Sequence, residues 1–229
     1  MPEVFIAIAV VLVIMMGFYY SRKRKVNKIL TYLNALLANN KDPDLFLSEM
    51  DGYIRKHPKR IYKTILIILK SKGLIWKGMW EECLDNLRSV DPKDILNDFN
   101  RVMYHYYWTF SLFNLDRENE ALSYIAENQA FLDSCLKKPV SFIANPAKKM
   151  FALQSYYTGD LQKAKGLFTE LDLLQKDDFS KAVNLYYLGM IAKNTNDAAA
   201  AEEAFAKAAD LGRTTYLPDL ISKARGAMK

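Results

Sequence analysis

Cysteine and histidine are scarce in this chain, which has two of each among 229 residues. The two cysteines, Cys83 and Cys135, cannot form a disulfide scaffold or a four-cysteine zinc site. His57 and His105 have no metal-binding type of partner three or four residues away, so a zinc pair is unsupported as well. Nine glycines and seven prolines are few for a turn-dense sandwich or barrel, and their scarcity favours helices.

Motifs that carry catalytic chemistry are also missing. The chain contains no G-x-x-x-x-G-K-S/T loop, no G-x-G-x-x-G fingerprint and no G-x-S-x-G elbow. Paired acids such as Glu81-Glu82 and Glu202-Glu203 fit solvated helix surfaces better than a reaction centre. Since no convergent set of reactive residues can be assembled, we expect a protein that is not an enzyme and has no catalytic residues, cofactor or metal.

One long apolar run stands out near the N-terminus, where residues 4–20 hold seventeen residues without a charge. A helix of that length spans roughly 26 Å, close to the hydrocarbon core of a bilayer. A cleaved signal peptide would carry basic residues before the run, whereas here Glu3 precedes it and the basic residues follow. A buried core helix is the third interpretation, but such helices are rarely apolar on every face. The sequence predicts a transmembrane signal-anchor helix over residues 1–21 that contacts the lipid bilayer through residues 4–20.

Basic residues cluster directly after this run, in residues 22–28. This juxtamembrane flank is predicted to lie at the membrane surface and contains Arg22, Lys23, Arg24, Lys25 and Lys28. The positive-inside rule then predicts a single-pass protein with its N-terminus outside and its C-terminal domain in the cytoplasm. A bacterial plasma membrane is assumed, although a receptor of the outer mitochondrial membrane could share this layout.

The net charge of +6 is unevenly distributed along the chain. Residues 22–80 contain 14 basic and 4 acidic residues, a net of +10, while residues 81–229 contain 18 basic and 21 acidic residues, a net of −3. Within this region, residues 52–80 carry eight basic residues and no acid. An alternative function is therefore an anionic-lipid or nucleic-acid binder that uses residues 52–80. Nucleic acid is the weaker option, because the basic residues alternate with an apolar run rather than with stacking aromatics.

Apolar residues recur at helical spacing after residue 25, and turn signals separate runs of helix length. Four units can be aligned, at residues 64–97, 102–135, 145–178 and 182–215. In the last unit, small and aromatic residues stand where two helices must approach closely: Gly189, Ala192, Ala201, Phe205 and Ala208. The unit at residues 145–178 repeats this pattern with Ala152, Gly159-Asp160, Ala164, Phe168 and Leu171.

This pattern resembles the tetratricopeptide repeat (TPR) family, most clearly over residues 145–215. The resemblance implies an all-α fold, in which the single transmembrane helix is followed by an α-solenoid of antiparallel helix pairs over residues 29–229. Residues 217–228 are expected to form a C-terminal capping helix. The unit starts are 38, 43 and 37 residues apart, longer than the family's usual repeat of about 34.

In repeats of this type, the first helices line a concave groove that binds peptides or partner helices. Aromatic and polar residues mapped to that face predict a partner-binding groove made of Trp76, Tyr106, Lys149, Tyr156, Tyr157, Tyr186, Lys193 and Asn194. The expected function is a membrane-anchored adaptor or scaffold that recruits an unidentified protein or peptide partner at the cytoplasmic membrane surface. The layout is similar to that of the bacterial lipopolysaccharide assembly protein B family. Proteins of that family end in a metal-binding module with paired cysteines, which this sequence does not contain.

Overall fold

The computed structural model describes residue 24 and residues 28–37, 39, 41–56 and 60–226. The chain divides into two compact units, Met1–Asp42 and Pro43–Lys229. In the first unit, residues 28–37 are helical. The predicted membrane span at residues 4–20 lies outside the described residues. A search limited to the described part of the chain finds no helix with the length and apolar character needed to cross a membrane.

The second unit is built from helices alone within its described residues, which confirms the all-α prediction for this part of the chain. The first half contains α2 (Pro43–Lys56), α3 (Arg60–Trp76), α4 (Trp80–Arg88), the short 3₁₀ helix η1 (Pro92–Asp94), α5 (Asp98–Asn114), α6 (Glu118–Glu127) and α7 (Gln129–Leu136). The second half contains α8 (Ser141–Tyr157), α9 (Leu161–Leu174), α10 (Asp178–Asn194), α11 (Ala198–Leu211) and α12 (Leu217–Gly226).

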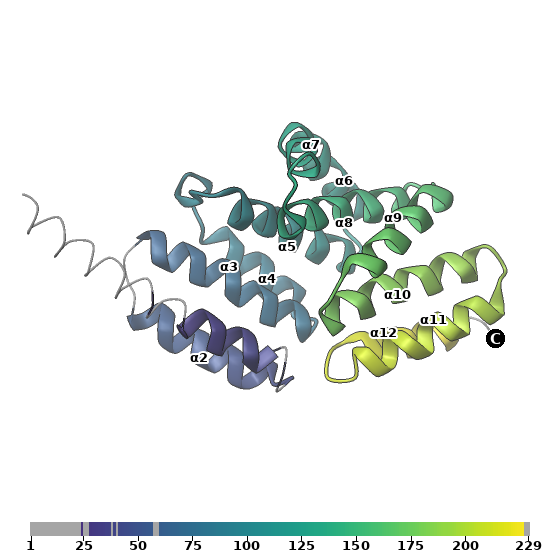
Figure 1. The fold of residues 1–229 in the computed structure, drawn as a ribbon, viewed down its shortest axis with the longest axis horizontal. Helices are drawn as coiled ribbons and strands as arrows, with labels where there is room; N and C mark the ends of the chain where they lie inside the picture. Colours follow the sequence, from purple (N-terminus) through teal and green to yellow (C-terminus); the bar gives the residue numbers. More distant parts are fainter. Residues whose placement is uncertain (1–23, 25–27, 38, 40, 57–59, 227–229) are drawn as a thin grey trace, which may run out of the picture. The chain divides into compact units, whose positions relative to one another are not determined.

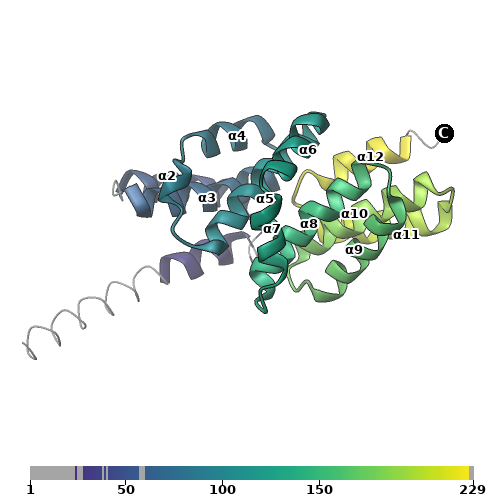
Figure 2. The ribbon, with the colours of Figure 1, turned by 90° about the horizontal axis from the view of Figure 1, so that it is seen from above.

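Four antiparallel helix pairs make up most of this unit: α3 with α4, α5 with α6, α8 with α9, and α10 with α11 (Figure 1). Each unit expected from the sequence begins inside the first helix of one pair. Seen from above, α5 and α8 lie between α3 and α10 (Figure 2). The additional helix α7 falls within the 43-residue interval, and its presence explains why that interval is the longest.

The turn inside each pair contains one residue in the left-handed region of backbone conformation. These residues are Gly78 (φ 72°), Asp116 (φ 56°), Gly159 (φ 83°) and Asn196 (φ 60°). Glycine, asparagine and aspartate tolerate this conformation best, so the same tight turn recurs in all four pairs. Asp160 and Asp197 cap the second helices α9 and α11 from the position just before each one, and their side chains accept hydrogen bonds from backbone N–H groups three residues later.

Small residues allow the paired helices to approach closely. A Cβ atom added to Gly189 of α10 would lie 2.7 Å from the ring of Phe205 on α11, so only glycine fits there. Phe205 is completely buried, as are Ala201 and Ala208 beside it on the same helix. The close-contact positions expected from the sequence are therefore confirmed in this pair. Helix α12 packs against α10 and α11 with Leu217 and Ile221 buried, as expected for a cap.

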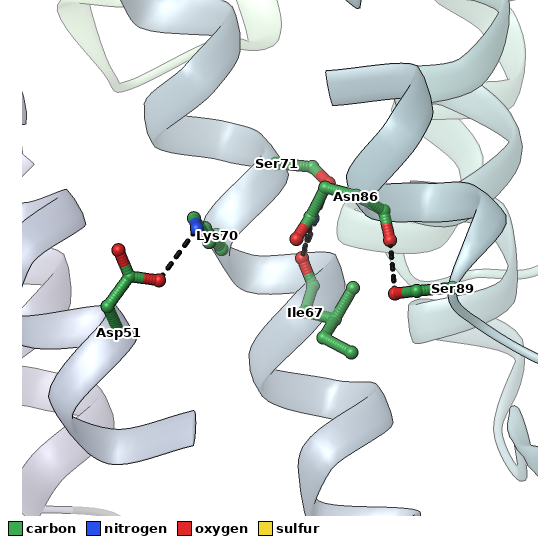
Figure 3. Close-up of polar contacts among 6 residues, drawn as sticks. All are labelled: Asp51, Ile67, Lys70, Ser71, Asn86 and Ser89. Atoms are coloured by element: carbon green, nitrogen blue, oxygen red, sulfur yellow. Dashed lines mark hydrogen bonds and ion pairs between the residues drawn. The ribbon is translucent and has the colours of Figure 1, made fainter. Parts of the chain in front are cut away.

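Polar side chains join α3 to its neighbours α2 and α4 (Figure 3). The amide of Asn86 on α4 donates to the Ile67 carbonyl oxygen at 2.8 Å and to the Ser71 hydroxyl at 2.9 Å, both on α3. On the other side of α3, the Lys70 ammonium bonds the Asp51 carboxylate of α2 at 2.6 Å. These contacts fix the register of α3 between α2 and α4.

Candidate interaction surface

The predicted groove residues come from the first helix of each pair. Trp76 ends α3, Tyr106 lies on α5, and α8 carries Lys149, Tyr156 and Tyr157. The remaining three residues, Tyr186, Lys193 and Asn194, lie on α10. In the structure, four of these eight residues are buried, three are accessible, and Lys193 is bonded to α12.

The first helix pair contacts the last one directly. The ring centroids of Trp76 and Phe179 are 4.9 Å apart, which brings the end of α3 against the first turn of α10. Trp80 packs edge-on against Tyr216, between α11 and α12, with centroids 4.6 Å apart. The backbone N–H of Tyr216 also donates to the Trp76 carbonyl oxygen at 3.2 Å. We call this set, with Gly78, the closing contact: Trp76, Gly78, Trp80, Phe179 and Tyr216.

Gly78 is required at the centre of the closing contact for two reasons. Its φ of 72° lies in the left-handed region, which strains residues with a side chain. An added Cβ would also lie 2.9 Å from the Cβ of Tyr216. The turn between α3 and α4 therefore approaches the turn before α12 as closely as backbone and side chain allow.

Four predicted groove residues are buried rather than displayed on an open concave face. The exposed fractions of Trp76 and Lys149 are 4% and 3%, and those of Tyr106 and Tyr186 are both 8%. Trp76 belongs to the closing contact itself, while Lys149 packs between Ser180 and Tyr106 and Tyr186 packs near Phe205. Their role in binding stays a prediction, but a partner would not reach these side chains in this conformation.

Lys149 has an unusual environment for a lysine. Its ammonium makes one long hydrogen bond, 3.4 Å to the Ser180 carbonyl oxygen, and lies 5.9 Å from the centre of the Tyr106 ring. Burial lowers the pKa of Lys149 to about 8, while the carboxylates of Asp177 and Asp172 raise it by attraction. Two of its three donors are thus poorly satisfied, which makes the charged form costly in this position.

The accessible group lies at the C-terminal ends of α8 and α10. Tyr156 and Tyr157 are half-buried and Asn194 is exposed. Burial raises the pKa of Tyr156, and the nearby Asn194 side chain partly offsets this, while the Tyr157 ring stacks on Phe113 at 4.2 Å with an angle of 5°. Burial raises the pKa of Tyr157 to about 12, so its hydroxyl stays neutral and available for hydrogen bonding. We call Tyr156, Tyr157 and Asn194 the aromatic edge.

Lys193, the eighth predicted groove residue, bonds within the chain. Its ammonium donates to the Ala224 carbonyl oxygen at 2.7 Å, near the end of α12. A cation near the C-terminus of a helix satisfies free carbonyl groups and is favoured by the helix dipole. The contact gives Lys193 a structural part in holding the cap against α10.

The basic residues of the juxtamembrane flank are only partly described. Arg24 and Lys28 are exposed, whereas Arg22, Lys23 and Lys25 lie outside the described residues. Within residues 52–80, Lys70 pairs with Asp51 and Lys77 pairs with Asp44, both acids lying on α2. These acids precede the segment in sequence, so its local charge is lower than the sequence count implied.

Among the described residues, no metal-binding cluster is present. A search of those residues finds no group of three histidine, cysteine or acidic side chains that could hold a metal ion. Cys83 is buried, and burial raises its pKa to about 11, so the unreactive thiol predominates at neutral pH. His105 is buried against Tyr124, with 2.7 Å between Nδ1 and the hydroxyl oxygen, and burial lowers its pKa to about 4.

Comparison with known proteins supports the repeat assignment. Residues 55–211 match the family model described as the SusR N-terminal TPR domain. The match covers α3 to α11 in full, which are the four helix pairs. TPR folds are typically non-catalytic and generally bind protein partners. Searches of curated proteins and of solved structures returned no match.

Proposed function

We propose a membrane-anchored protein-interaction scaffold as the function, from the premise that this chain belongs to the SusR N-terminal TPR domain family. The observation that carries the proposal is the match across all four helix pairs. Stacked helix pairs of this kind present side chains from several helices to one partner. The partner is a protein or peptide that contacts the inner face of the repeats.

The membrane part of the proposal is supported by the sequence. Residues 4–20 are uncharged, and five basic residues follow within residues 22–28. Each central apolar residue favours insertion by about 0.3 to 0.6 kcal/mol, and the basic flank favours the cytoplasmic side. Tethering the repeats to a membrane raises the effective concentration of scaffold and partner, so a weak interaction suffices.

Protease accessibility tests this topology. In sealed, right-side-out membrane vesicles, added protease should leave the repeat domain intact, and detergent should make it cleavable. Alkaline carbonate, which strips peripheral proteins, should leave the chain in the membrane pellet. Release into the supernatant would refute the anchor, and digestion in sealed vesicles would refute the cytoplasmic orientation.

The aromatic edge is the part of the predicted groove that a partner can reach in this conformation. It combines aromatic area with polar groups, a combination common at protein interfaces. Pairing of Lys70 and Lys77 with acids of α2 disfavours the alternative, a lipid or nucleic-acid binder that uses residues 52–80.

Crosslinking in intact cells tests the proposed surface. A photoreactive residue at Asn194 is at the aromatic edge, and the same residue at Lys163 provides a control on the exposed side of α9. We expect a specific protein adduct from position 194 that is absent from position 163. Identical adducts from both positions, or none from either, would contradict recruitment at this edge.

A further inference from the structure

We propose that the closing contact is a latch that controls access of the partner to the inner face of the repeats. When the latch opens, the turn between α3 and α4 separates from Phe179 and Tyr216. The buried groove residues, namely Trp76, Tyr106, Lys149 and Tyr186, then become available to bind. This inference rests on the proposed scaffold function and adds a closed state in which only the aromatic edge can bind.

The latch joins parts of the unit that are otherwise far apart along the chain. The more extensive helix contacts run between near neighbours, from α3 to α5, α5 to α8, α8 to α9 and α9 to α10. The latch instead brings Trp76 and Trp80 to Phe179 and Tyr216, across more than 90 residues. Its members come from turns and helix ends. Separation of these groups leaves the stacking of neighbouring pairs intact, so opening does not require the unit to unfold.

The closed state leaves buried donors poorly satisfied. The indole N–H of Trp76 donates to no acceptor among the described residues. The Lys149 ammonium has only its long bond to Ser180, the residue next to Phe179. Opening would give both groups access to water or to acceptors of a partner, which offsets part of the aromatic contact that is lost. These poorly satisfied donors therefore reduce the free-energy cost of opening below the cost set by the lost aromatic contacts alone.

Lys149 provides a direct reporter of opening in the unmodified chain. Its ammonium lies beneath the latch, bonded to the first turn of α10, and its side chain is 3% exposed. An amine-reactive reagent near pH 8 would label it only after opening, whereas Lys163 on the exposed side of α9 would be labelled at once. Since the pKa of Lys149 is about 8, lack of access rather than protonation limits its reaction at that pH.

The first experiment follows labelling of the full chain in mild detergent by mass spectrometry. The latch predicts that Lys149 is labelled more slowly than Lys163, yet faster than the unfolding rate measured in urea and extrapolated to water. Low urea concentrations should change the rate little, because local opening exposes little surface. A Lys149 rate equal to the global unfolding rate would overturn the latch.

The second experiment weakens the latch. Tyr216→Ala removes the ring that packs on Trp80 and should accelerate labelling of Lys149 by about tenfold, the effect of losing one good aromatic pair. Phe142→Ala is the matched control, because Phe142 has an edge-on aromatic contact with Phe99 that lies outside the latch. If Lys149 is labelled at the same rate in the Tyr216→Ala and Phe142→Ala chains, the latch is refuted. If Tyr216→Ala does not fold, the experiment on the unmodified chain still decides the question.

Tryptophan emission gives an independent readout. The chain has three tryptophans, and Trp108→Phe leaves only Trp76 and Trp80, both in the latch. In that background Tyr216→Ala should shift the emission to the red and increase quenching by acrylamide, while Phe142→Ala should do neither. An unchanged spectrum in a folded Tyr216→Ala chain would contradict opening.

Crosslinking of the partner in the Tyr216→Ala chain distinguishes a failure of the latch from a failure of the scaffold function. Both proposals together predict that Tyr216→Ala increases the adduct yield from a photoreactive residue at Asn194. Faster labelling of Lys149 with no adduct in either chain would refute the scaffold and leave the opening motion standing. Faster labelling with an unchanged adduct yield would refute control of partner access by the latch.

Discussion

Replacement of Lys149 by methionine should stabilise the protein at neutral pH. Burial lowers the pKa of this lysine from 10.5 to about 8, despite the attraction of Asp177 and Asp172. A shift of about 2.5 units corresponds to roughly 3 kcal/mol, at 1.36 kcal/mol per unit. Methionine has a similar length and no charge, and it loses only the long hydrogen bond to Ser180 and the distant contact with the Tyr106 ring. Lys149→Met should therefore raise the free energy of unfolding by about 2 to 3 kcal/mol at pH 7.

The same pKa shift predicts how this difference depends on pH. Between pH 8 and 10.5, Lys149 is largely neutral in the folded chain and still protonated in the unfolded chain, so the unfolded state binds more protons. The stability of the unmodified chain therefore rises relative to the variant across that window. Below pH 8 both states are protonated and the full penalty remains. The advantage of Lys149→Met should be constant below pH 8 and shrink towards zero by pH 10.5.

Urea unfolding at pH 7, 8.5 and 10 measures the effect. Comparing the two chains at each pH cancels the titration of groups that they share, including the tyrosines. Lys163→Met, at an exposed position on α9, is the control and should change stability by less than about 0.5 kcal/mol. A Lys149→Met chain less stable than the unmodified one at pH 7, or a difference that does not depend on pH, would refute the reasoning.

Three further predictions concern stability. Burial in the folded chain lowers the pKa of His105 to about 4, so the free energy of unfolding should fall by about 3 kcal/mol from pH 6.5 to pH 4. In urea unfolding, His105→Asn should lose less over this range, and equal losses in the two chains would contradict this account. Gly189→Ala should lower the free energy of unfolding by about 1 to 3 kcal/mol, because the added methyl group collides with Phe205. Gly166→Ala has open space around it and should raise the free energy of unfolding by about 0.5 kcal/mol. If the thermal midpoints of both variants move in the same direction, this account of the packing is wrong. Asn86→Ala should cost about 1 to 2 kcal/mol, because it removes both hydrogen bonds to α3, and a neutral effect in denaturation would show that these bonds do not hold the first pair together.

The helix pairs could be predicted from the sequence because their signals are local. Ala201 and Phe205 of the last pair lie within one turn of each other on α11, and Gly189 faces them from the preceding helix. Glycine, asparagine and aspartate at the turns mark where each pair reverses, and the structure places one left-handed residue in each such turn. Local spacing and turn chemistry thus determine the pairs and their order. The cap α12 was predictable for the same reason.

The burial of the inner face could not be predicted in this way. Trp76 and Phe179 are in contact across 103 positions of the chain, and neither belongs to the small and aromatic positions that define the repeat. The helical period places Lys149 on the inner face of α8, but it contains no information on what covers that face. For that reason the sequence predicts one shared side of the repeats for the eight residues, but it does not predict their exposure. The extra helix α7 was missed because residues 129–136 follow α6 without a strong turn signal.

The closing contact changes the affinity with which the inner face of the repeats can bind a partner. In an open solenoid, the affinity for a partner depends only on the side chains that line the groove. In a closed one, part of the binding energy is used to separate Trp76 and Trp80 from Phe179 and Tyr216, and the apparent affinity falls with the population of the open state. With the membrane anchor proposed above, a partner that is itself located at the membrane would meet this cost more readily than a freely diffusing one, because anchoring would raise its effective concentration. Closed repeats on an anchor would therefore favour partners that are already at the membrane over soluble proteins of equal intrinsic affinity.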